Sequence, residues 1–207
     1  MRRENPLREH DALRNRYFGL RHGESEANLA QIVLSDPAVG TVRYGLSERG
    51  RAQVRESVAA AASELGGEAR VLSSDFTRTR ETAELAAEVL GVEEVELEVA
   101  LRERFFGAWE GTSNENYQRV WAHDAEDPEH EEQGVESAAA VVERVAGLVA
   151  RLEAEHEGET FVLVSHGDAL QLLQTAFLRL SPATHREREH WAPAEVRALE
   201  LGGEAGE

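Results

Sequence analysis

A histidine flanked by arginine and glycine comes directly after an apolar segment near the start of the chain. The histidine is His22, and the segment is Tyr-Phe-Gly-Leu at residues 17–20. An apolar segment that stops at a glycine-containing turn is typical of a buried strand, and catalytic groups gather at strand ends in open α/β sheets. The guanidinium of Arg21 suits phosphate oxygens, and an unprotonated imidazole is a nucleophile near pH 7. The pair therefore predicts phosphoryl transfer to His22.

A second histidine follows another apolar segment. Residues 161–164 are Phe-Val-Leu-Val, and Ser165, His166 and Gly167 come next. A single histidine after a buried strand often only fixes a loop, but two strands that each end near His-Gly favour a shared site. We expect His166 to donate a hydrogen bond to a phosphoryl oxygen and to stabilise charge in the transition state.

Six short segments follow one another in a characteristic order. They are Arg21 to Ser25, Leu46 to Gly50, Ser73 to Arg78, Leu101 to Arg104, Gly134 to Ser137 and Ser165 to Gly167. In this order they resemble the histidine phosphatase superfamily, the phosphoglycerate-mutase-like proteins, from Arg16 to about Leu201. The resemblance implies an α/β fold of three α/β/α layers with a mostly parallel central sheet. It also implies hydrolysis of phosphate monoesters through a phosphohistidine on His22.

Such a reaction needs a general acid for the leaving alcohol. On chemistry alone Glu24, Glu103 and Glu110 are all candidates. The resemblance selects Glu103, because it fills the acid position of the Leu-x-Glu-Arg segment. Glu103 would protonate the leaving alkoxide and then, as a carboxylate, activate the water that hydrolyses the intermediate.

Two arginines are expected to hold the phosphate. Arg78 falls in the first turn of a predicted helix, where free backbone N–H groups also attract an anion. The alternative is a surface arginine on an amphipathic helix, which suits Arg80 better than Arg78. The match of Arg78 to the family's Ser-Ser-x-x-x-Arg pattern favours phosphate binding beside Arg21. Asn28 either donates an amide hydrogen bond to the phosphate or caps a short helix. Gly167 is expected to contact the phosphate too, and Arg104 to contact the substrate.

The charges around His22 bear on its protonation. Arg21 and Arg78 disfavour a further positive charge on the imidazole and so lower its pKa. In similar proteins the backbone of the following glycine holds the other ring nitrogen, which here is Gly23. The scheme needs no cofactor and no metal, because the arginines and His166 supply the positive charge. The remaining histidines match no strong zinc pattern.

Mutase activity is the nearest alternative. Phosphoglycerate mutases of this superfamily grip a substrate carboxylate with a lysine and with arginines in a long insertion. In this chain Phe106 stands where a tyrosine is expected, Asn114 stands where the lysine would be, and the stretch from Glu103 to His166 is short for the insertion. These departures favour hydrolysis. Mutase-type phosphoryl transfer and a non-catalytic phospho-ligand binding protein remain open.

Strand and helix patterns alternate along most of the chain, which predicts a mostly parallel sheet covered on both faces. The predicted strands are residues 17–20, 70–73, 92–99, 161–164 and 195–201. The predicted helices are residues 47–65, 76–90, 136–156 and 170–180. Residues 16–201 are expected to form one domain, with residues 1–15 and 202–207 as frayed tails.

The alternation is interrupted at residues 105–133, which are expected to form an irregular lid. This stretch contains an acidic segment, residues 123–132. One hypothesis places the acidic segment at the mouth of the site, where it would disfavour polyanionic substrates. The alternative is a solvated loop with no role.

Composition excludes several classes of partner. A net charge of −18 disfavours binding to nucleic acid or anionic lipid, both of which require a basic surface. All 22 basic residues are arginine, so no lysine chemistry is available, and the absence of cysteine excludes disulfides and thiolate metal sites. No apolar run is long enough for a membrane span, and no signal peptide precedes the first strand. We expect a cytoplasmic protein that acts on a small phosphorylated metabolite, with an edge strand available for a homodimer.

Overall fold

The computed structural model describes residues 3–202 and centres on a five-stranded sheet of order β3-β2-β4-β1-β5. The pairs β3-β2, β2-β4 and β4-β1 are parallel, and β5 pairs antiparallel with β1. The strands are β1 (Arg16–Arg21), β2 (Arg70–Ser73), β3 (Val95–Leu97), β4 (Thr160–Ser165) and β5 (Val196–Leu199). The predicted mostly parallel sheet is confirmed.

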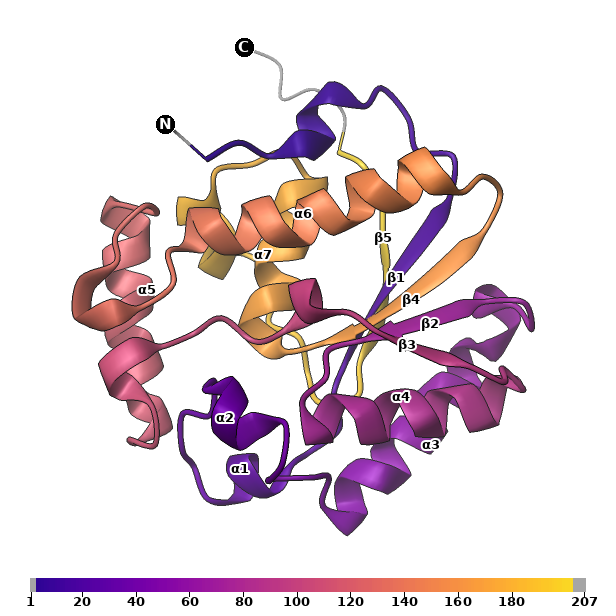
Figure 1. Cartoon of the computed structure of the whole chain (residues 1–207), viewed down its shortest axis with the longest axis horizontal. Helices are drawn as coiled ribbons and strands as arrows, with labels where there is room; N and C mark the ends of the chain where they lie inside the picture. The colour runs from indigo at the N-terminus through magenta and orange to yellow at the C-terminus, as the bar shows by residue number, and fades with distance from the viewer. Residues whose placement is uncertain (1–2, 203–207) are drawn as a thin grey trace.

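Helices cover both faces of this sheet (Figure 1), so the predicted three layers are also confirmed. Figure 1 shows α3 and α4 on one face and α6 and α7 on the other. The α-helices are α1 (Glu26–Leu29), α2 (Pro37–Gly40), α3 (Glu48–Leu65), α4 (Thr77–Leu90), α5 (Tyr117–Glu126), α6 (Ala138–Glu155) and α7 (Gly167–Phe177). Short 3-10 helices are η1 (Pro6–Glu9), η2 (Val99–Leu101), η3 (Gly107–Trp109), η4 (Asn114–Asn116), η5 (Glu132–Gly134) and η6 (Pro182–Glu187).

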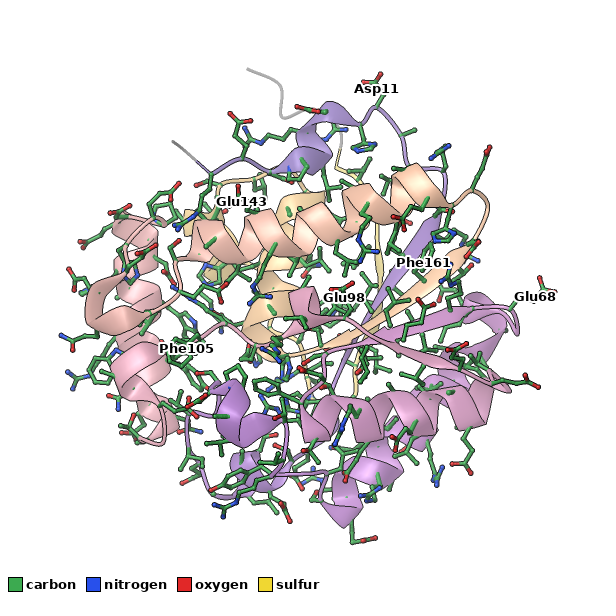
Figure 2. All side chains as sticks on the ribbon, in the orientation of Figure 1. Asp11, Glu68, Glu98, Phe105, Glu143 and Phe161 are labelled. Atoms are coloured by element: carbon green, nitrogen blue, oxygen red, sulfur yellow. The ribbon has the colours of Figure 1, made fainter. Side chains whose placement is uncertain are left out.

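The alternation of side chains along β4 divides the core in two. Phe161 and Leu163 join the cluster formed with α6 and α7, whereas Val162 and Val164 join the cluster formed with α3 and α4. A strand that is buried on both faces has a continuous apolar sequence, which explains why residues 161–164 lack any polar position. Figure 2 shows Phe161 between the layers and Glu143 on the outer face of α6.

The helix ends carry the capping signals expected from the sequence. The side chain of Ser47 accepts a hydrogen bond from the backbone N–H of Gly50 at the start of α3. Gly91 ends α4 in the left-handed conformation, with φ of 72°. The predicted strand over residues 92–99 is shorter than expected, because only Val95–Leu97 pair with β2, at the edge of the sheet.

The first residues of the chain differ from the frayed tail that the sequence suggested. Leu7 is fully buried in the cluster with α6 and α7, and the Asn5 side chain donates to the carbonyl of Ala176. Asn15 and Tyr17 both donate to the carboxylate of Glu153 on α6. Residues 3–15 are therefore tied to the helical layer. The expected tail at 202–207 lies outside the described residues from residue 203 onward.

Residues 105–133 are more regular than the irregular lid expected from the sequence. They contain α5 and two 3-10 helices, η3 and η4. A small core of their own holds them together with the loop after α1, and its buried members are Val33, Phe106, Val120 and Val135. This unit stands beside the sheet rather than on one of its faces (Figure 1). Among the described helices, none is both long and apolar enough to cross a membrane.

Two glycines let the start of α3 approach the loop after β1. A side chain on Gly23 would place Cβ 2.5 Å from the carbonyl oxygen of Gly50, and one on Gly50 would place Cβ 2.0 Å from the carbonyl oxygen of Glu24. Both contacts are with backbone, which cannot swing aside as a long side chain does. The loop that carries His22 is therefore fixed by a close backbone contact.

Gly50→Ala is expected to destabilise the fold by about 1–3 kcal/mol, the usual range for overpacking. Gly147→Ala is the matched control, because Gly147 also lies within a helix and has nothing within 4 Å of the added Cβ. That change should be neutral or stabilise by up to about 1 kcal/mol, since alanine is the better helix former. Urea unfolding of both variants measures the difference, and equal stability of the two would contradict the proposed backbone contact.

Candidate active site

The carboxyl ends of three neighbouring strands bring the predicted residues together. His22 follows β1, and its backbone N–H donates to the carbonyl of Ser165 at the end of β4, 3.0 Å away. The rings of His22 and His166 lie edge to face with centroids 5.4 Å apart. Arg78, in the first turn of α4 after β2, donates from Nε to Nε2 of His22 over 3.2 Å. Two imidazoles and a guanidinium from distant parts of the chain thus form one cluster.

The hydrogen bonds of His22 define which nitrogen carries the proton. Nδ1 lies 2.7 Å from the carbonyl oxygen of Gly23 and must donate to it, as expected from the sequence. Nε2 accepts from Arg78, so its lone pair is free of a proton. Burial lowers the pKa of His22 well below its usual value, and the charges of Arg78 and Arg21 lower it further. The sequence named the charges, but burial is the larger cause.

His166 is also neutral, for similar reasons. Burial, followed by the charge of Arg78, holds its pKa well below the usual value. Its Nε2 lies 2.9 Å from Oγ of Ser74. If the Ser74 hydroxyl donates to Nε2, the proton of the neutral ring sits on Nδ1, which is buried and has no hydrogen-bond acceptor in the described chain.

The two arginines at the site lack carboxylate partners among residues 3–202. Nη2 of Arg78 donates to the carbonyl of Leu34 over 3.0 Å, and Nη1 of Arg21 donates to the carbonyl of Trp191. Nη1 of Arg78 and Nε of Arg21 are buried without an acceptor. Nδ1 of His166 is a third buried nitrogen without a partner, and it is a third donor when the Ser74 hydroxyl donates to Nε2. Unsatisfied buried donors are costly, and an anion with several oxygens is the group that would satisfy them.

Glu103 lies at the same site and is held by backbone groups. One of its carboxylate oxygens, Oε1, accepts from the N–H groups of Arg104 at 3.0 Å and of Ala169 at 3.2 Å. Burial, and after it the nearby charge of Asp168, raise the pKa of Glu103 to about 6, although the charge of Arg78 opposes the shift. A carboxyl group with such a pKa can both give and take a proton near neutral pH.

These groups surround a cavity of about 190 Å³. Its floor contains Arg21, His22, Arg78, Glu103 and Gly167. Gly167 leaves room for the side chain of Arg21. A Cβ atom at residue 167 would lie only 3.2 Å from Cζ of Arg21 and would crowd it. Residues 105–133 supply one wall through Asn114, Tyr117 and Trp121. His166 does not line the cavity itself but packs directly against the ring of His22.

Asn28 has the capping role that the sequence left open. Its Oδ1 accepts from both the backbone N–H and the hydroxyl of Ser25, and its own N–H donates to that hydroxyl, so the two residues form the capping box of α1. Asn28 also lines the cavity. A contact between its amide group and phosphate stays a prediction.

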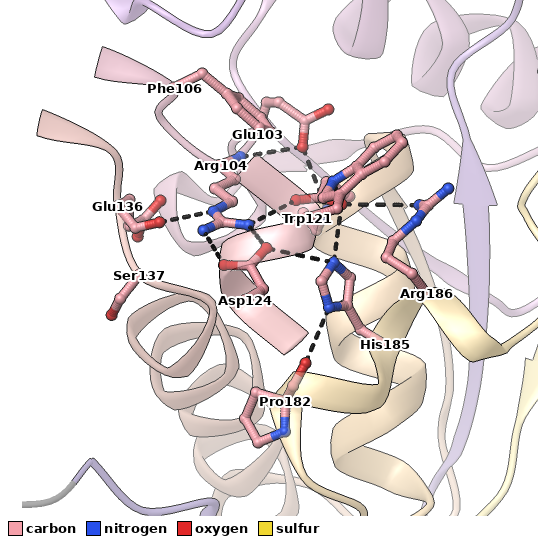
Figure 3. A network of polar contacts seen from close by, with 12 residues as sticks. Glu103, Arg104, Phe106, Trp121, Asp124, Glu136, Ser137, Pro182, His185 and Arg186 are labelled. Carbon is pink, nitrogen blue, oxygen red and sulfur yellow. Dashed lines mark hydrogen bonds and ion pairs between the residues drawn. The ribbon is translucent and has the colours of Figure 1, made fainter. Parts of the chain in front are cut away.

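Arg104 is not placed to touch a substrate, which corrects the expectation from the sequence. Its side chain is fully buried behind the cavity and pairs with Asp124 through two hydrogen bonds of 2.6 and 2.7 Å (Figure 3). A third contact of 3.3 Å joins it to Asp168, and Nε donates to the carbonyl of Glu136. Arg104 therefore ties α5 and α7 together.

Asp168 is the residue that sequence reasoning missed. Its Oδ1 accepts from the indole N–H of Trp121 over 2.9 Å and lies 3.5 Å from Nε2 of His185. Burial alone would raise the pKa of Asp168, but His185 and the charges of Arg104 and Arg186 outweigh it, so the group stays ionised. Its position directly after His-Gly was the one available signal.

The acidic segment 123–132 does not lie at the mouth of the cavity, so that hypothesis is wrong. None of its residues lines the cavity. Glu129 and Glu131 instead pair with Arg3, and Asp124 is the buried partner of Arg104. Within residues 3–202, no group of three or more His, Cys, Asp or Glu side chains is arranged to hold a metal ion. The absence of a metal in the reaction stays a prediction.

A family model described as the histidine phosphatase superfamily (branch 1) matches residues 17–207. The chain belongs to this superfamily. None of the curated proteins matches the sequence.

Several solved structures share the fold. A mycobacterial glucosyl-3-phosphoglycerate phosphatase, in complex with VO3, is 27% identical, with 88% of this chain and 90% of that chain covered and a TM-score of 0.75. A protein titled mycobacterial hydrolase 2 is 28% identical, with 88% and 80% covered and a TM-score of 0.72. A phosphoserine phosphatase from Entamoeba histolytica is 24% identical, with 89% of each chain covered and a TM-score of 0.72. The last of these shows the fold alone.

Arg104→Met is expected to lower the free energy of unfolding by roughly 3–5 kcal/mol, because it leaves the buried carboxylates of Asp124 and Asp168 short of their main cation. Arg55→Met is the control: Arg55 forms an exposed ion pair with Glu88, and such pairs contribute about 1 kcal/mol or less. Denaturant unfolding checks both. A stable Arg104→Met protein with an impaired KM would instead restore Arg104 as a substrate contact.

Proposed function

We propose that this protein is a metal-independent phosphatase of the histidine acid phosphatase type, which hydrolyses monoesters of small metabolites through a phosphohistidine on His22. One observation carries the proposal. Beside the unprotonated Nε2 of His22, Nη1 of Arg78 and Nε of Arg21 are buried without an acceptor among residues 3–202, and Nδ1 of His166 joins them when the Ser74 hydroxyl donates to its Nε2. A phosphoryl group attached to His22 has three oxygens, and in-line displacement at phosphorus depends on neutralising them.

In the first step, Nε2 of His22 attacks phosphorus and the bond to the alcohol oxygen breaks. Protonated Glu103 gives its proton to the leaving alkoxide. The N–H of Arg78, which now holds the nucleophile's lone pair, turns to a phosphoryl oxygen, and Nδ1–H of His166 donates to another. The carbonyl of Gly23 accepts from the other ring nitrogen and stabilises the charge that develops on the imidazole.

In the second step, Glu103 acts as a carboxylate. It takes a proton from water, the water oxygen attacks phosphorus, and the P–N bond to His22 breaks. Inorganic phosphate leaves, and Glu103 is protonated for the next cycle. A pKa of about 6 suits both steps, because the protonated and the ionised form of Glu103 are both populated near neutral pH.

The size and lining of the cavity favour a small phosphate monoester. A cavity of about 190 Å³ has room for a phosphate and the group attached to it. The name of the 27% identical mycobacterial phosphatase, a glucosyl-3-phosphoglycerate phosphatase, supports a hydrolase of metabolite phosphates. Phe106 stands where a mutase is expected to have a tyrosine. It has no hydroxyl group, and its side chain is fully buried. Hydrolysis is therefore favoured over transfer to a second alcohol.

Incubation with 32P-labelled glycerol 3-phosphate in EDTA, followed by an alkaline quench, is expected to leave an acid-labile label on the wild-type chain. His22→Ala should carry no label and release no phosphate. His123→Ala is the control, because His123 is half-exposed and lies outside the cavity. Label or turnover that persists in His22→Ala would overturn the assignment. Activity that disappears in EDTA and returns with a divalent cation would overturn the metal-free scheme.

The pH profile tests Glu103. Because Glu103 must be protonated in the first step, kcat/KM for glycerol 3-phosphate should fall as pH rises above about 6. Glu103→Gln should lose about 10²- to 10⁴-fold with this substrate, the usual contribution of a general acid, but much less with 4-nitrophenyl phosphate, whose leaving group needs no proton.

Glu110→Gln is the matched control for this experiment. Glu110 is the rival acid from the sequence, but its carboxylate accepts from the backbone and hydroxyl of Ser35 and does not line the cavity. Its pH profile should match that of the wild type. Equal losses for both substrates in Glu103→Gln would show that Glu103 is not the proton donor.

A further inference from the structure

His190 is a side chain at the cavity that the proposed reaction does not use. It follows η6 and lines the cavity beside Arg21. Nε2 of its ring lies 3.1 Å from Nη1 of Arg21, and Nδ1 lies 3.4 Å from Nη2 of Arg186. The ring therefore stands between two guanidinium groups, one of which belongs to the proposed phosphate site.

The charges around His190 keep its ring neutral. Burial, followed by the charges of Arg21 and Arg186, lowers the pKa of His190 to about 4. Asp168 on α7 opposes this shift, and Arg197 on β5 adds to it. A neutral imidazole has one lone pair, so it accepts from only one of the two neighbouring arginines. The shorter contact is with Arg21, which places the lone pair on Nε2 and leaves the 3.4 Å contact with Arg186 without a hydrogen bond.

Arg197 holds the backbone around His190 in place. Its Nη1 donates to the carbonyl of Glu189 over 3.0 Å, and its Nη2 donates to the carbonyl of His190 over 2.8 Å. Its guanidinium also lies 4.7 Å from the ring centre of Trp191, which is fully buried. The backbone from which the His190 ring and the Trp191 carbonyl reach Arg21 is therefore anchored to β5.

Two protein acceptors take up one nitrogen of Arg21. Nη1 carries two N–H groups, and its acceptors are the carbonyl of Trp191 and Nε2 of His190. Nε and Nη2 form another edge of the planar guanidinium. A Cβ at residue 167 would lie 3.3 and 3.4 Å from these two atoms, so the glycine leaves that edge uncovered. Gly167 lines the cavity, and the Nε–Nη2 edge therefore lies beside it.

We propose that His190 is a positioning residue for phosphate binding: its neutral ring accepts from Nη1 of Arg21 and thereby turns the Nε–Nη2 edge toward the phosphoryl oxygens. The inference rests on the proposed phosphate site and adds the residue that orients one of its arginines. A guanidinium edge binds two oxygens at once only when its plane is correctly oriented. The carbonyl of Trp191 alone would let the guanidinium turn about one contact, and the second acceptor fixes its plane.

Calorimetry with inorganic phosphate on the His22→Ala background measures this role without turnover. Adding His190→Ala should weaken phosphate binding roughly 3- to 10-fold, the range for one hydrogen bond between neutral or singly charged groups. His190→Gln keeps an acceptor at this position and should bind phosphate within about twofold of the background. His123→Ala is the control and should change nothing, because His123 lies outside the cavity.

A double-mutant cycle with Arg21→Met separates positioning from a direct contact with phosphate. Because His190 acts through Arg21, His190→Ala should weaken binding no further once the guanidinium is gone. Phosphorus-31 NMR titration extends the measurement to the weak binding expected of Arg21→Met. Losses that add would contradict the role, as would a His190→Ala chain that binds phosphate as tightly as the background.

Nitrogen-15 NMR of the histidine rings gives a readout that needs no ligand. At pH 7 His190 should be neutral with its proton on Nδ1, and the loss of its signal in His190→Gln assigns it. A charged ring, or a neutral ring with its proton on Nε2, would overturn the hydrogen bond to Arg21.

The two sets of measurements also separate this role from the proposed reaction. If the ring signature and the phosphate results hold while the wild-type chain hydrolyses no ester, the role of His190 stands and only the proposed phosphatase function fails. A chain that binds no phosphate at all contradicts the role, since Arg21 then has no anion to meet.

Discussion

The structure depends on keeping the imidazole of His22 neutral while two guanidinium groups that form no ion pair with a carboxylate in the described chain lie beside it. His22 is buried, and neither Arg21 nor Arg78 has a carboxylate partner within residues 3–202. Repulsion between these groups is tolerable only if the backbone fixes them. The pairing of β1 with β4, the carbonyls of Leu34 and Trp191, and the start of α4 supply that fixation. The result is a positively charged pocket around Nε2 of His22, in which the donors are in place before an anion binds.

A second buried network of charged side chains lies behind the cavity. Arg104 joins Asp124 of α5 to Asp168 of α7, and Asp168 in turn orients Trp121 and raises the pKa of Glu103. The same ion cluster thus positions a wall of the cavity and contributes to the raised pKa of Glu103. Such a cluster contributes little net stability compared with apolar packing, because its desolvation is costly. Its value here lies in fixing where α5 sits relative to the strand ends.

The sequence predicted that His22, Arg78 and His166 lie together because each of them follows a recognisable strand. An apolar run predicts a strand, and the residues after β1 and β4 must meet wherever parallel strands are neighbours. Arg104 was assigned wrongly because its partner Asp124 lies in a segment with no strand or helix predicted. A signal for α5 did exist, since Tyr117, Val120 and Trp121 repeat at helical spacing. The anchoring of Leu7 beneath α6 had no such signal, because it depends on contacts far along the chain.

The strong negative charge of the chain and the positive charge of the site act at different ranges. At physiological ionic strength, charges separated by more than about 8 Å are largely screened. The net charge of −18 therefore repels an approaching anionic substrate only weakly. Buried charges are screened much less, and Arg21 and Arg78 therefore dominate once an anion enters the cavity. Glu129 and Glu131, which follow α5, are paired with Arg3 and line no part of the cavity.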